Sequence, residues 1–460
     1  MKTGRSQQYK IEKDELLQLQ YNLIRSHSCG IGKPLNEVYA RSMVLARINN
    51  FLQGNSGVNP DVISQLVVFL NSQITPEIYE HGGVGASGDL VQLAHLGLNL
   101  IGEGYVYYEG ERVKTKEAFE KLNIHPLELT LRDGLAIING TSCMTGIGAV
   151  NLIYAYRLLE WATAASAIIN EIVESFDDSF SKILNQVKLH PGQQTVAAKM
   201  RKLLSDSSLI RDRKKLFDDA HEFKRSEFKN KIQEYYSIRC VPQILGPVTD
   251  TLDYAKQVIE NEINSTNDNP VVIPSENNVY HGGNFHGDYI SLEMDKLKIA
   301  ITKVSVLAER QLNFLLNHRL NNKFPSFLSS GKPGLNYGLQ GMQFTATSTT
   351  AENQSLCNSV YVHSIPNNND NQDVVSMGTN SAVMAKKVIE NSFQVMAIHL
   401  IAVCQAIDLL KDSEREKLSS NTKKIHQFIR SKAAFIDDDV SHSEKIREVY
   451  LLLKENVFPL

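Results

Sequence analysis

Long stretches without helix-breaking residues constrain the fold of this chain more than any other feature. Five stretches that contain neither glycine nor proline make up half of its 460 residues: 149–190, 193–241, 248–269, 288–324 and 379–458. Strand-rich proteins need turns far more often than this. Within 288–324, apolar residues recur at steps of three and four and predict a helix from Ser291 to Asn317: Leu297, Ile301, Val304, Ala308, Leu312 and Leu315. A shorter apolar stripe precedes Gly54: Val38, Leu45, Ile48 and Leu52.

Helices of this length need partners along their whole length, which predicts a mainly α bundle. Long bundle helices also tend to recruit further subunits, so an oligomer is expected. Glycine and proline concentrate in residues 81–148, 242–287 and 325–341. Irregular backbone, and with it a functional site, is therefore expected in those three regions. Residues 367–371 form a short polar island and predict a loop.

Composition and charge exclude several classes of function. A net charge of −3 argues against a nucleic-acid-binding protein, which would carry a basic patch. The five cysteines are scattered and odd in number, which favours reduced thiols in the cytoplasm. The N-terminus has no apolar signal core, and residues 90–101, the closest approach to a membrane span, contain polar side chains. No histidine or cysteine spacing indicates a metal site.

Residues 81–90 form a glycine-rich segment in which Gly83 to Gly88 match the pattern G-x-G-x-x-G. In dinucleotide-binding proteins that pattern follows a buried strand inside a βαβ unit. Residues 75–80 do not resemble such a strand, and no βαβ unit surrounds the loop, which argues against a nicotinamide or flavin site. A second interpretation is a tight turn that enters a helix at Asp89, because glycines are common in turns.

The third interpretation of the same loop is chemical. The amide nitrogen of Gly88 can attack the carbonyl carbon of Ala86 and close a five-membered ring. Dehydration, including loss of the Ser87 hydroxyl, then leaves a methylidene-imidazolone, a strong electrophile made without an external cofactor. Glycine suits the third position because a side chain would crowd the closure. The tripeptide alone is too common to support this chemistry, so the surrounding sequence has to decide.

The surrounding sequence closely resembles the signature of the histidine/phenylalanine/tyrosine ammonia-lyase family. The resemblance begins in residues 82–95 and continues, in the family's order, through 134–141, 233–240, 282–287 and 371–378. It covers almost the whole chain. It implies a long-helix bundle of the fumarase/aspartase-like type, an autocatalytic 4-methylidene-imidazol-5-one from Ala86, Ser87 and Gly88, and a homotetramer whose sites are shared between subunits.

The resemblance also implies roles for individual residues. Arg239 matches the arginine that binds the substrate carboxylate, a task suited to a bidentate guanidinium. Tyr236 matches a catalytic tyrosine beside the electrophile. Phe285 matches a packing position, and a plain core role for it stays open. Polar groups around the ring and substrate are matched by Asn139, Gln233, Asn284, Gln340, Asn368, Asn371 and Gln372. Asparagine amides can donate to an oxyanion without adding charge.

Two positions bear on the substrate. His27, in a Ser-His pair common in the histidine-acting branch, suits an imidazole or a phenol better than a plain phenyl ring. It can also be a satisfied structural histidine. Histidine-acting members usually carry glutamate at the position of Gln372 and histidine at that of Val374. The pair therefore favours L-tyrosine, converted to trans-4-coumarate and ammonia. Histidine, phenylalanine and an aminomutase reaction remain alternatives.

One departure from the family pattern concerns the N-terminus. The family's catalytic base is a tyrosine in a Tyr-Gly-x-Asn-Thr-Gly-Phe-Gly loop, which residues 1–11 do not contain, and Tyr9 does not replace it by motif. A misassigned start codon, a truncated or degenerate gene, or an expressed form without its lid would each explain this. We expect this 460-residue product to turn over poorly, although the residues that form the electrophile are present.

The predicted organisation has three parts. Residues 1–140 form an N-terminal region with the electrophile loop, 141–410 a central long-helix bundle, and 411–460 a helical tail. A second hypothesis, from a different class, is a non-catalytic helical homo-oligomer that has lost the family's chemistry.

Overall fold

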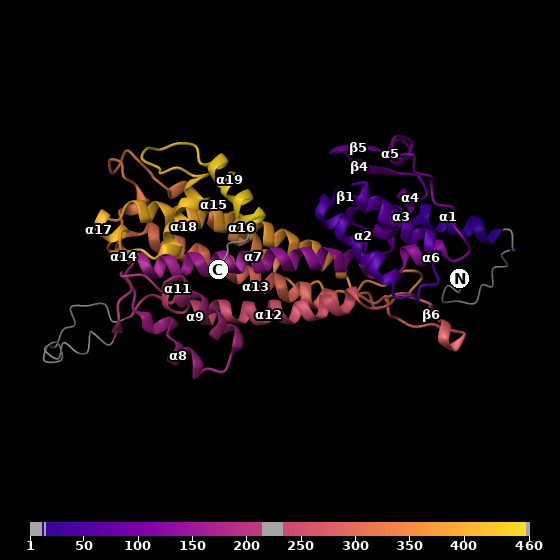
Figure 1. Ribbon diagram of the computed structural model, residues 1–460, viewed down its shortest axis with the longest axis horizontal. Helices are drawn as coiled ribbons and strands as arrows, with labels where there is room; N and C mark the ends of the chain where they lie inside the picture. The colour runs from indigo at the N-terminus through magenta and orange to yellow at the C-terminus, as the bar shows by residue number, and fades with distance from the viewer. Residues whose placement is uncertain (1–11, 13–14, 214–232, 457–460) are drawn as a thin grey trace. The chain divides into compact units, whose positions relative to one another are not determined.

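The computed structural model describes residues 12, 15–213 and 233–456 of the chain (Figure 1). The expectation about Tyr9 and the N-terminal segment lies outside the described residues. Helices dominate, which confirms the mainly α prediction. The chain divides into two compact units, each built from separate segments. The first comprises 1–152, 254–297 and 358–386, and the second comprises 153–253, 298–357 and 387–460.

The first unit packs short helices around the glycine-rich loop. They are α1 Glu15–His27, α2 Glu37–Phe51, α3 Pro60–Asn71, α4 Leu90–Leu100, α5 Thr115–Leu122 and α6 Asp133–Ile138. The helix α4 contacts both α1 and α6, and its residues Leu93, Leu96 and Leu100 are fully buried. This apolar packing fixes the position of the loop that leads into α4.

Short strands complete the first unit and correct one expectation about the loop. The strand β1 Ile31–Pro34 pairs with β3 Tyr79–His81, and β2 Thr75–Pro76 pairs with β4 Tyr105–Tyr108, which also pairs with β5 Glu111–Lys114. A third sheet joins β6 Val271–Ile273 to β7 Asn278–Tyr280. Strand structure therefore does precede the glycine-rich loop. Other segments of the same chain supply its hydrogen bonds, and the local sequence does not reveal them. All these pairs are antiparallel, so they form no βαβ unit.

The helix α2 forms where the apolar stripe predicted, but the stripe does not face the core. Val38, Leu45 and Leu52 are 45%, 59% and 64% exposed, and only Ile48 of the predicted stripe is buried. The buried face carries Tyr39, Ala40, Met43 and Val44 instead. Both faces of α2 are apolar, so periodicity alone could not identify the inward one.

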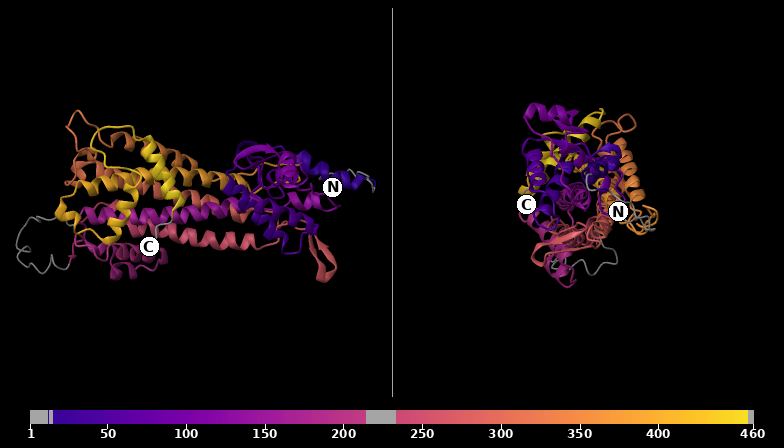
Figure 2. Two further views of the ribbon diagram at one scale, coloured as in Figure 1. Left: turned by 45° about the horizontal axis from the view of Figure 1, so that its top comes forward. Right: turned by 90° about the vertical axis from the view of Figure 1, so that its right-hand side faces the viewer.

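Four long helices contribute residues to both units: α7 Ser142–Ile172, α12 Val241–Ile263, α13 Asp288–Leu316 and α16 Gly378–Asp408. The observed α13 confirms the helix predicted from Ser291 to Asn317. In the second unit these helices run beside one another (Figure 2). Gln311 of α13 donates a 2.9 Å hydrogen bond to Ser166 of α7. Polar contacts of this kind fix the register of otherwise apolar helix faces.

Shorter helices cover the bundle of the second unit. They are α8 Lys182–Gln186, α9 Pro191–Leu203, α11 Tyr236–Arg239, α14 His318–Asn321, α15 Gln340–Leu356, α17 Asp412–Arg415, α18 Ser420–Arg430 and α19 Ser443–Glu455. Asn353 of α15 is fully buried and donates to Ser305 over 3.2 Å and to Ser392 over 3.0 Å. These bonds connect α15 to α13 and α16.

One described helix, α16, is long and apolar enough to cross a membrane by length and composition alone. The sequence had indicated residues 90–101 as the nearest approach to such a span, and α16 passes that test more clearly. Of its most apolar window, 89% is buried inside the protein. Burial of this extent is typical of the core helix of a bundle, which is apolar on every side.

Candidate active site

The Ala86–Gly88 tripeptide sits in a tight turn with unusual backbone angles. Gly85 and Gly88 form an isolated antiparallel bridge, so the chain folds back on itself around Ala86 and Ser87. Ser87 has φ = 69°, a left-handed backbone conformation that residues other than glycine rarely adopt. Asp89 follows as the N-cap of α4, which confirms a turn that enters a helix. Such strain persists only where the surroundings impose it.

The surroundings of this turn leave no room for larger residues. A Cβ atom on Gly85 would lie 2.1 Å from the Ser376 hydroxyl, and one on Gly88 would lie 2.1 Å from the Gly140 carbonyl oxygen. The hydroxyl of Ser376 is buried and has no hydrogen-bond partner among the described residues. A compact turn beside an unpaired buried hydroxyl fits a backbone that rearranges into a ring. The residues present therefore fit the self-formed group that the family resemblance implies.

Three hydrogen-bond donors converge on Ser87. The side-chain amide of Asn139 donates to its carbonyl oxygen over 3.1 Å, and the backbone amide of Gly140 donates to the same oxygen over 3.4 Å. The side-chain amide of Gln372 donates to its hydroxyl oxygen over 3.3 Å. The structure thus brings two of the predicted site residues, from distant parts of the sequence, onto the central residue of the tripeptide. Both ends of the Ser87 residue are held by neutral donors.

Asp89 directly follows the tripeptide and is fully buried. Its carboxylate accepts 2.9 Å hydrogen bonds from the backbone amides of Cys143 and Met144, in the first turn of α7. It also accepts a short hydrogen bond from the hydroxyl of Thr379, in the first turn of α16. Burial raises the pKa of Asp89 to about 6, although these three donors act to lower it. The carboxylate thus ties the loop to the N-termini of two long helices.

Gln372 reaches Ser87 from a tight loop with a left-handed tip. Asn367 and Gln372 pair as an antiparallel bridge, and Asn368, Asn369 and Asp370 have φ values of 52°, 54° and 62°. This confirms the predicted polar loop. Asparagine and aspartate tolerate left-handed geometry better than most residues. Asn368 and Asn371 shape the tip, where the amide of Asn371 donates to the carbonyl of Asn368 over 3.2 Å.

The base of the same loop is fixed by Asp295 of α13. This buried carboxylate accepts hydrogen bonds from the hydroxyl of Ser359 and from the backbone amides of Val360 and Tyr361, over 2.7 to 2.9 Å. A further bond comes from Ser381 of α16 over 2.6 Å. The loop that carries Gln372 therefore begins at a well-anchored point.

Three other predicted residues lie in the first unit. His27, at the end of α1, uses its Nδ1 atom to contact the carbonyl of Leu23 at 2.8 Å. Asn284 is exposed, donates to the carbonyl of Thr266 over 3.2 Å, and lines a cavity of about 370 Å³. Phe285 follows it and is partly buried.

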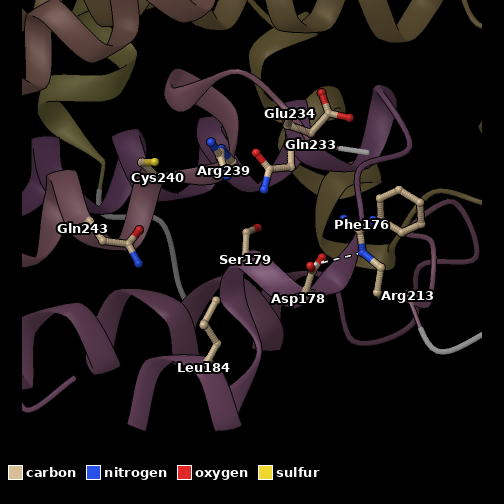
Figure 3. Close-up of a pocket in the computed structure, with 10 residues that line it drawn as sticks. All are labelled: Phe176, Asp178, Ser179, Leu184, Arg213, Gln233, Glu234, Arg239, Cys240 and Gln243. Atoms are coloured by element: carbon tan, nitrogen blue, oxygen red, sulfur yellow. Dashed lines mark hydrogen bonds and ion pairs between the residues drawn. The ribbon is translucent and has the colours of Figure 1, made fainter. Parts of the chain in front are cut away.

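The remaining predicted residues belong to the second unit. Gln233 and Arg239 line a cavity of about 490 Å³ that also contains Glu234, Cys240 and Gln243 (Figure 3). The Nε atom of Arg239 is buried without a hydrogen-bond partner in the described part of the chain. The guanidinium carbon of Arg239 lies 4.9 Å from the centre of the Tyr236 ring, which is itself 70% exposed. Gln340 begins α15.

Sequence reasoning assigned no role to several residues that hold this site. Asp89 and Gly140 lie within the motifs but were assigned no function, and Asp295 and Thr379 lie outside every motif. The position of Asp89, between a glycine turn and a helix, is a recognisable capping signal. The other contacts join residues far apart in the chain, so no local pattern marks them.

A mainly α fold and a strained Ala-Ser-Gly turn held by amide donors define the class of ammonia-lyases and aminomutases that use a methylidene-imidazolone group. A family model described as aromatic amino acid lyase matches residues 2–431. The chain belongs to the aromatic amino acid lyase family.

Three relatives show how similar the chain is to members of this family. The tyrosine ammonia-lyase of Cupriavidus metallidurans is 39% identical over 444 residues, which cover 95% of this chain and 83% of the relative. The histidine ammonia-lyase of Bacillus subtilis is 38% identical and covers 99% of this chain and 86% of the relative. A solved structure of tyrosine aminomutase from Streptomyces globisporus superposes with a TM-score of 0.92 at 38% identity, covering 97% of this chain and 85% of that one.

Proposed function

We propose that this protein eliminates ammonia from L-tyrosine to give trans-4-coumarate, with an electrophile formed from Ala86, Ser87 and Gly88. The observation that carries the proposal is the convergence of Asn139 and Gly140 on the carbonyl oxygen of Ser87, which the ring retains. Donors fixed in advance around one residue are what charge development in a reaction requires. No external cofactor is needed for such a reaction.

Ring formation balances with the residues present. The Gly88 nitrogen bonds to the Ala86 carbonyl carbon, and the Ala86 oxygen leaves as water with the two amide hydrogens of Gly88 and Ser87. The Ser87 hydroxyl leaves as a second water with the Ser87 Cα hydrogen. The carbonyl oxygen of Ser87 is retained, and this is the atom that Asn139 and Gly140 hold.

The group supplies an electrophilic methylene that makes the substrate amine a better leaving group. Asn139 and Gly140 stabilise the negative charge that develops on the Ser87 carbonyl oxygen. Two donors aimed at one oxygen form an oxyanion hole, and removal of one such donor typically costs about 10²–10³ in kcat.

The proposal also assigns a group that binds the substrate carboxylate. The guanidinium of Arg239 pairs with the carboxylate, which its unpaired, buried Nε atom supports. Tyr236 acts in catalysis, while Gln233 and Gln340 contribute polar contacts. Asn284, Phe285, Asn368 and Asn371 are proposed to line the substrate. We further propose a homotetramer with sites shared between subunits. The exposed apolar side chains of Val38 and Leu45 on α2, and of Leu52 at its C-cap, support association.

Two residues bear on the choice of substrate in this proposal. A carbonyl oxygen only accepts hydrogen bonds, so the Nδ1 atom of His27 donates to Leu23 and leaves Nε2 as an acceptor in the neutral ring. An acceptor suits the phenol hydroxyl. Gln372 is neutral, whereas a carboxylate there would balance an imidazolium. L-tyrosine is therefore preferred to L-histidine.

The aminomutase similarity supports a second candidate, in which the amine returns to the neighbouring carbon of the same substrate. The test incubates the protein separately with tyrosine, histidine and phenylalanine. Ultraviolet absorbance then reports the arylacrylate, and mass spectrometry of derivatised amino acids reports a β-amino acid. We expect coumarate from tyrosine at the highest rate. Urocanate as the main product, or β-tyrosine exceeding coumarate, would replace the proposed reaction. An intact ring without any product would favour the non-catalytic oligomer.

A further inference from the structure

Arg47 is a fully buried arginine that the chemistry above does not use. It projects from α2, and its guanidinium has acceptors in three separate segments. It donates a short hydrogen bond to the carbonyl of Ala136, a 3.5 Å bond to the Ser142 hydroxyl and a 3.4 Å bond to the Asp268 carboxylate. Burial of an ion pair contributes little net stability, because desolvation offsets the attraction. The pair therefore calls for a reason other than stability.

Two of these acceptors, Ala136 and Asp268, belong to the segments that determine the orientation of Asn139. Ala136 precedes Asn139 by three residues in α6, and Asp268 precedes Asn269. The backbone amide of Asn269 donates to the Asn139 side-chain oxygen over 2.7 Å. That bond leaves the NH₂ group of Asn139 directed at the Ser87 carbonyl. Arg47 thus connects the segment that carries this amide to the segment that sets which end of it faces Ser87.

The same guanidinium packs against Gly140. A Cβ atom on Gly140 would lie 2.6 Å from the Nη1 atom of Arg47, so the peptide rests directly on the arginine. Gly140 contacts both sides of the tripeptide turn, because its amide donates to Ser87 and its carbonyl accepts a 2.8 Å bond from the amide of Asp89. A displacement of the guanidinium would therefore shift Gly140, which is hydrogen-bonded directly to the turn.

We propose that Arg47 is a positioning residue for formation of the ring. It acts through Asn139 and Gly140, which hold the Ser87 carbonyl while the Gly88 nitrogen approaches Ala86. The inference rests on the proposed function, because it presupposes that the ring forms. A shift of about 1 Å in reacting groups can lower a rate about 100-fold. The planar guanidinium of Arg47 also lies over the Phe51 ring, with its carbon 4.2 Å from the ring centre. A lysine ammonium cannot reproduce this planar contact.

The experiment measures ring content in the full-length chain. Wild type, Arg47→Met and Arg47→Lys are purified, and folded protein is selected by circular dichroism and size-exclusion chromatography. Intact mass at successive times after expression begins gives the fraction that has lost two waters, and hence the rate of ring formation, and ultraviolet difference absorbance of the ring provides a second measure. We expect that Arg47→Met forms the ring at least about tenfold more slowly than wild type, and that Arg47→Lys is intermediate. Arg430→Met, which removes a mostly buried ion pair with Asp408 in the second unit, should convert fully.

The outcomes separate the two proposals. Wild type without loss of water would overturn the proposed function itself. Wild type that converts, beside folded Arg47→Met that converts at the same rate, would overturn only the positioning role. If Arg47→Met does not fold, Arg47→Lys decides, since it keeps the charge and loses the fork. Equal conversion by wild type and Arg47→Lys would then also contradict the inference.

Discussion

The side-chain amide of Asn139 lies 3.1 Å from the carbonyl oxygen of Ser87, in a position where Asn139 is only 2% exposed. Because the Asn269 amide occupies the side-chain oxygen of Asn139, the amide cannot turn away without losing a buried bond. The pair is therefore arranged before any substrate arrives. Arrangement in advance is what makes such a donor effective in catalysis.

Replacement of Asn139 by aspartate should remove this donor while nearly preserving its shape. A carboxylate only accepts hydrogen bonds, so it would oppose charge on the Ser87 oxygen. We expect kcat for coumarate formation to fall about 10²–10³-fold, measured by absorbance with intact mass reporting the ring. Asn99→Asp is the matched control, since Asn99 is equally buried in the same unit and bonds to Glu103 and Tyr105 instead. Equal losses in both variants would point to general destabilisation.

Gln372→Glu tests the basis for substrate choice. The variant replaces a neutral amide with a negative charge that suits an imidazolium. We expect kcat/KM for tyrosine to fall and the ratio of histidine to tyrosine activity to rise by about tenfold or more. The comparison uses steady-state rates for both amino acids. An unchanged ratio would show that Gln372 does not govern the preference.

The sequence predicted the parts of this structure that local patterns encode. The helix α13 followed from apolar periodicity, and the turn into α4 followed from glycines before Asp89. The inward face of α2 did not follow, because apolar residues lie on both of its faces. Asn139 and Gln372 were named through family resemblance, yet their convergence on Ser87 required tertiary structure.

Contacts that support the site were beyond local reasoning for a physical reason. Arg47, Ala136 and Asp268 meet across more than 200 residues of chain, as the separation of 221 between Arg47 and Asp268 shows. Nothing in the neighbourhood of either residue marks it as buried. Charged side chains are exposed by default, and only the folded chain reveals the exceptions.

Asp89→Asn should change how stability depends on pH. Burial raises the pKa of Asp89 to about 6 from an ordinary value of 3.8. A raised pKa means that this group's contribution is fully present below pH 3.8 and is lost as pH rises through about 6. Asparagine does not titrate, so the variant should gain up to about 3 kcal/mol relative to wild type between pH 4 and pH 7.

The measurement for Asp89→Asn is the difference in Tm between variant and wild type at several pH values in that window. Asp61→Asn, which removes an exposed carboxylate of α3, controls for loss of one negative charge. A difference in Tm that stays constant across the window would contradict the titration of Asp89.

His399 of α16 is fully buried, and neither ring nitrogen has a hydrogen-bond partner among the described residues. Burial lowers its pKa to about 3, so the folded protein holds the neutral ring. The stability of wild type that depends on this neutral form is present above pH 6.5 and is lost as pH falls toward 3. His399→Leu should therefore be more stable than wild type at pH 7.5, by about 1 kcal/mol, because unpaired buried polar atoms are removed.

The advantage of His399→Leu should grow below pH 6.5 by up to about 1.4 kcal/mol per pH unit, since the unfolded wild type gains a proton that the folded form excludes. Tm measured from pH 7.5 to pH 5 tests both parts of this expectation. His426→Leu is the contrasting control, because His426 lies 2.8 Å from the carboxylate of Asp408 and its loss should destabilise the protein. If His399→Leu is less stable than wild type throughout, the imidazole packs better than its unpaired nitrogens cost.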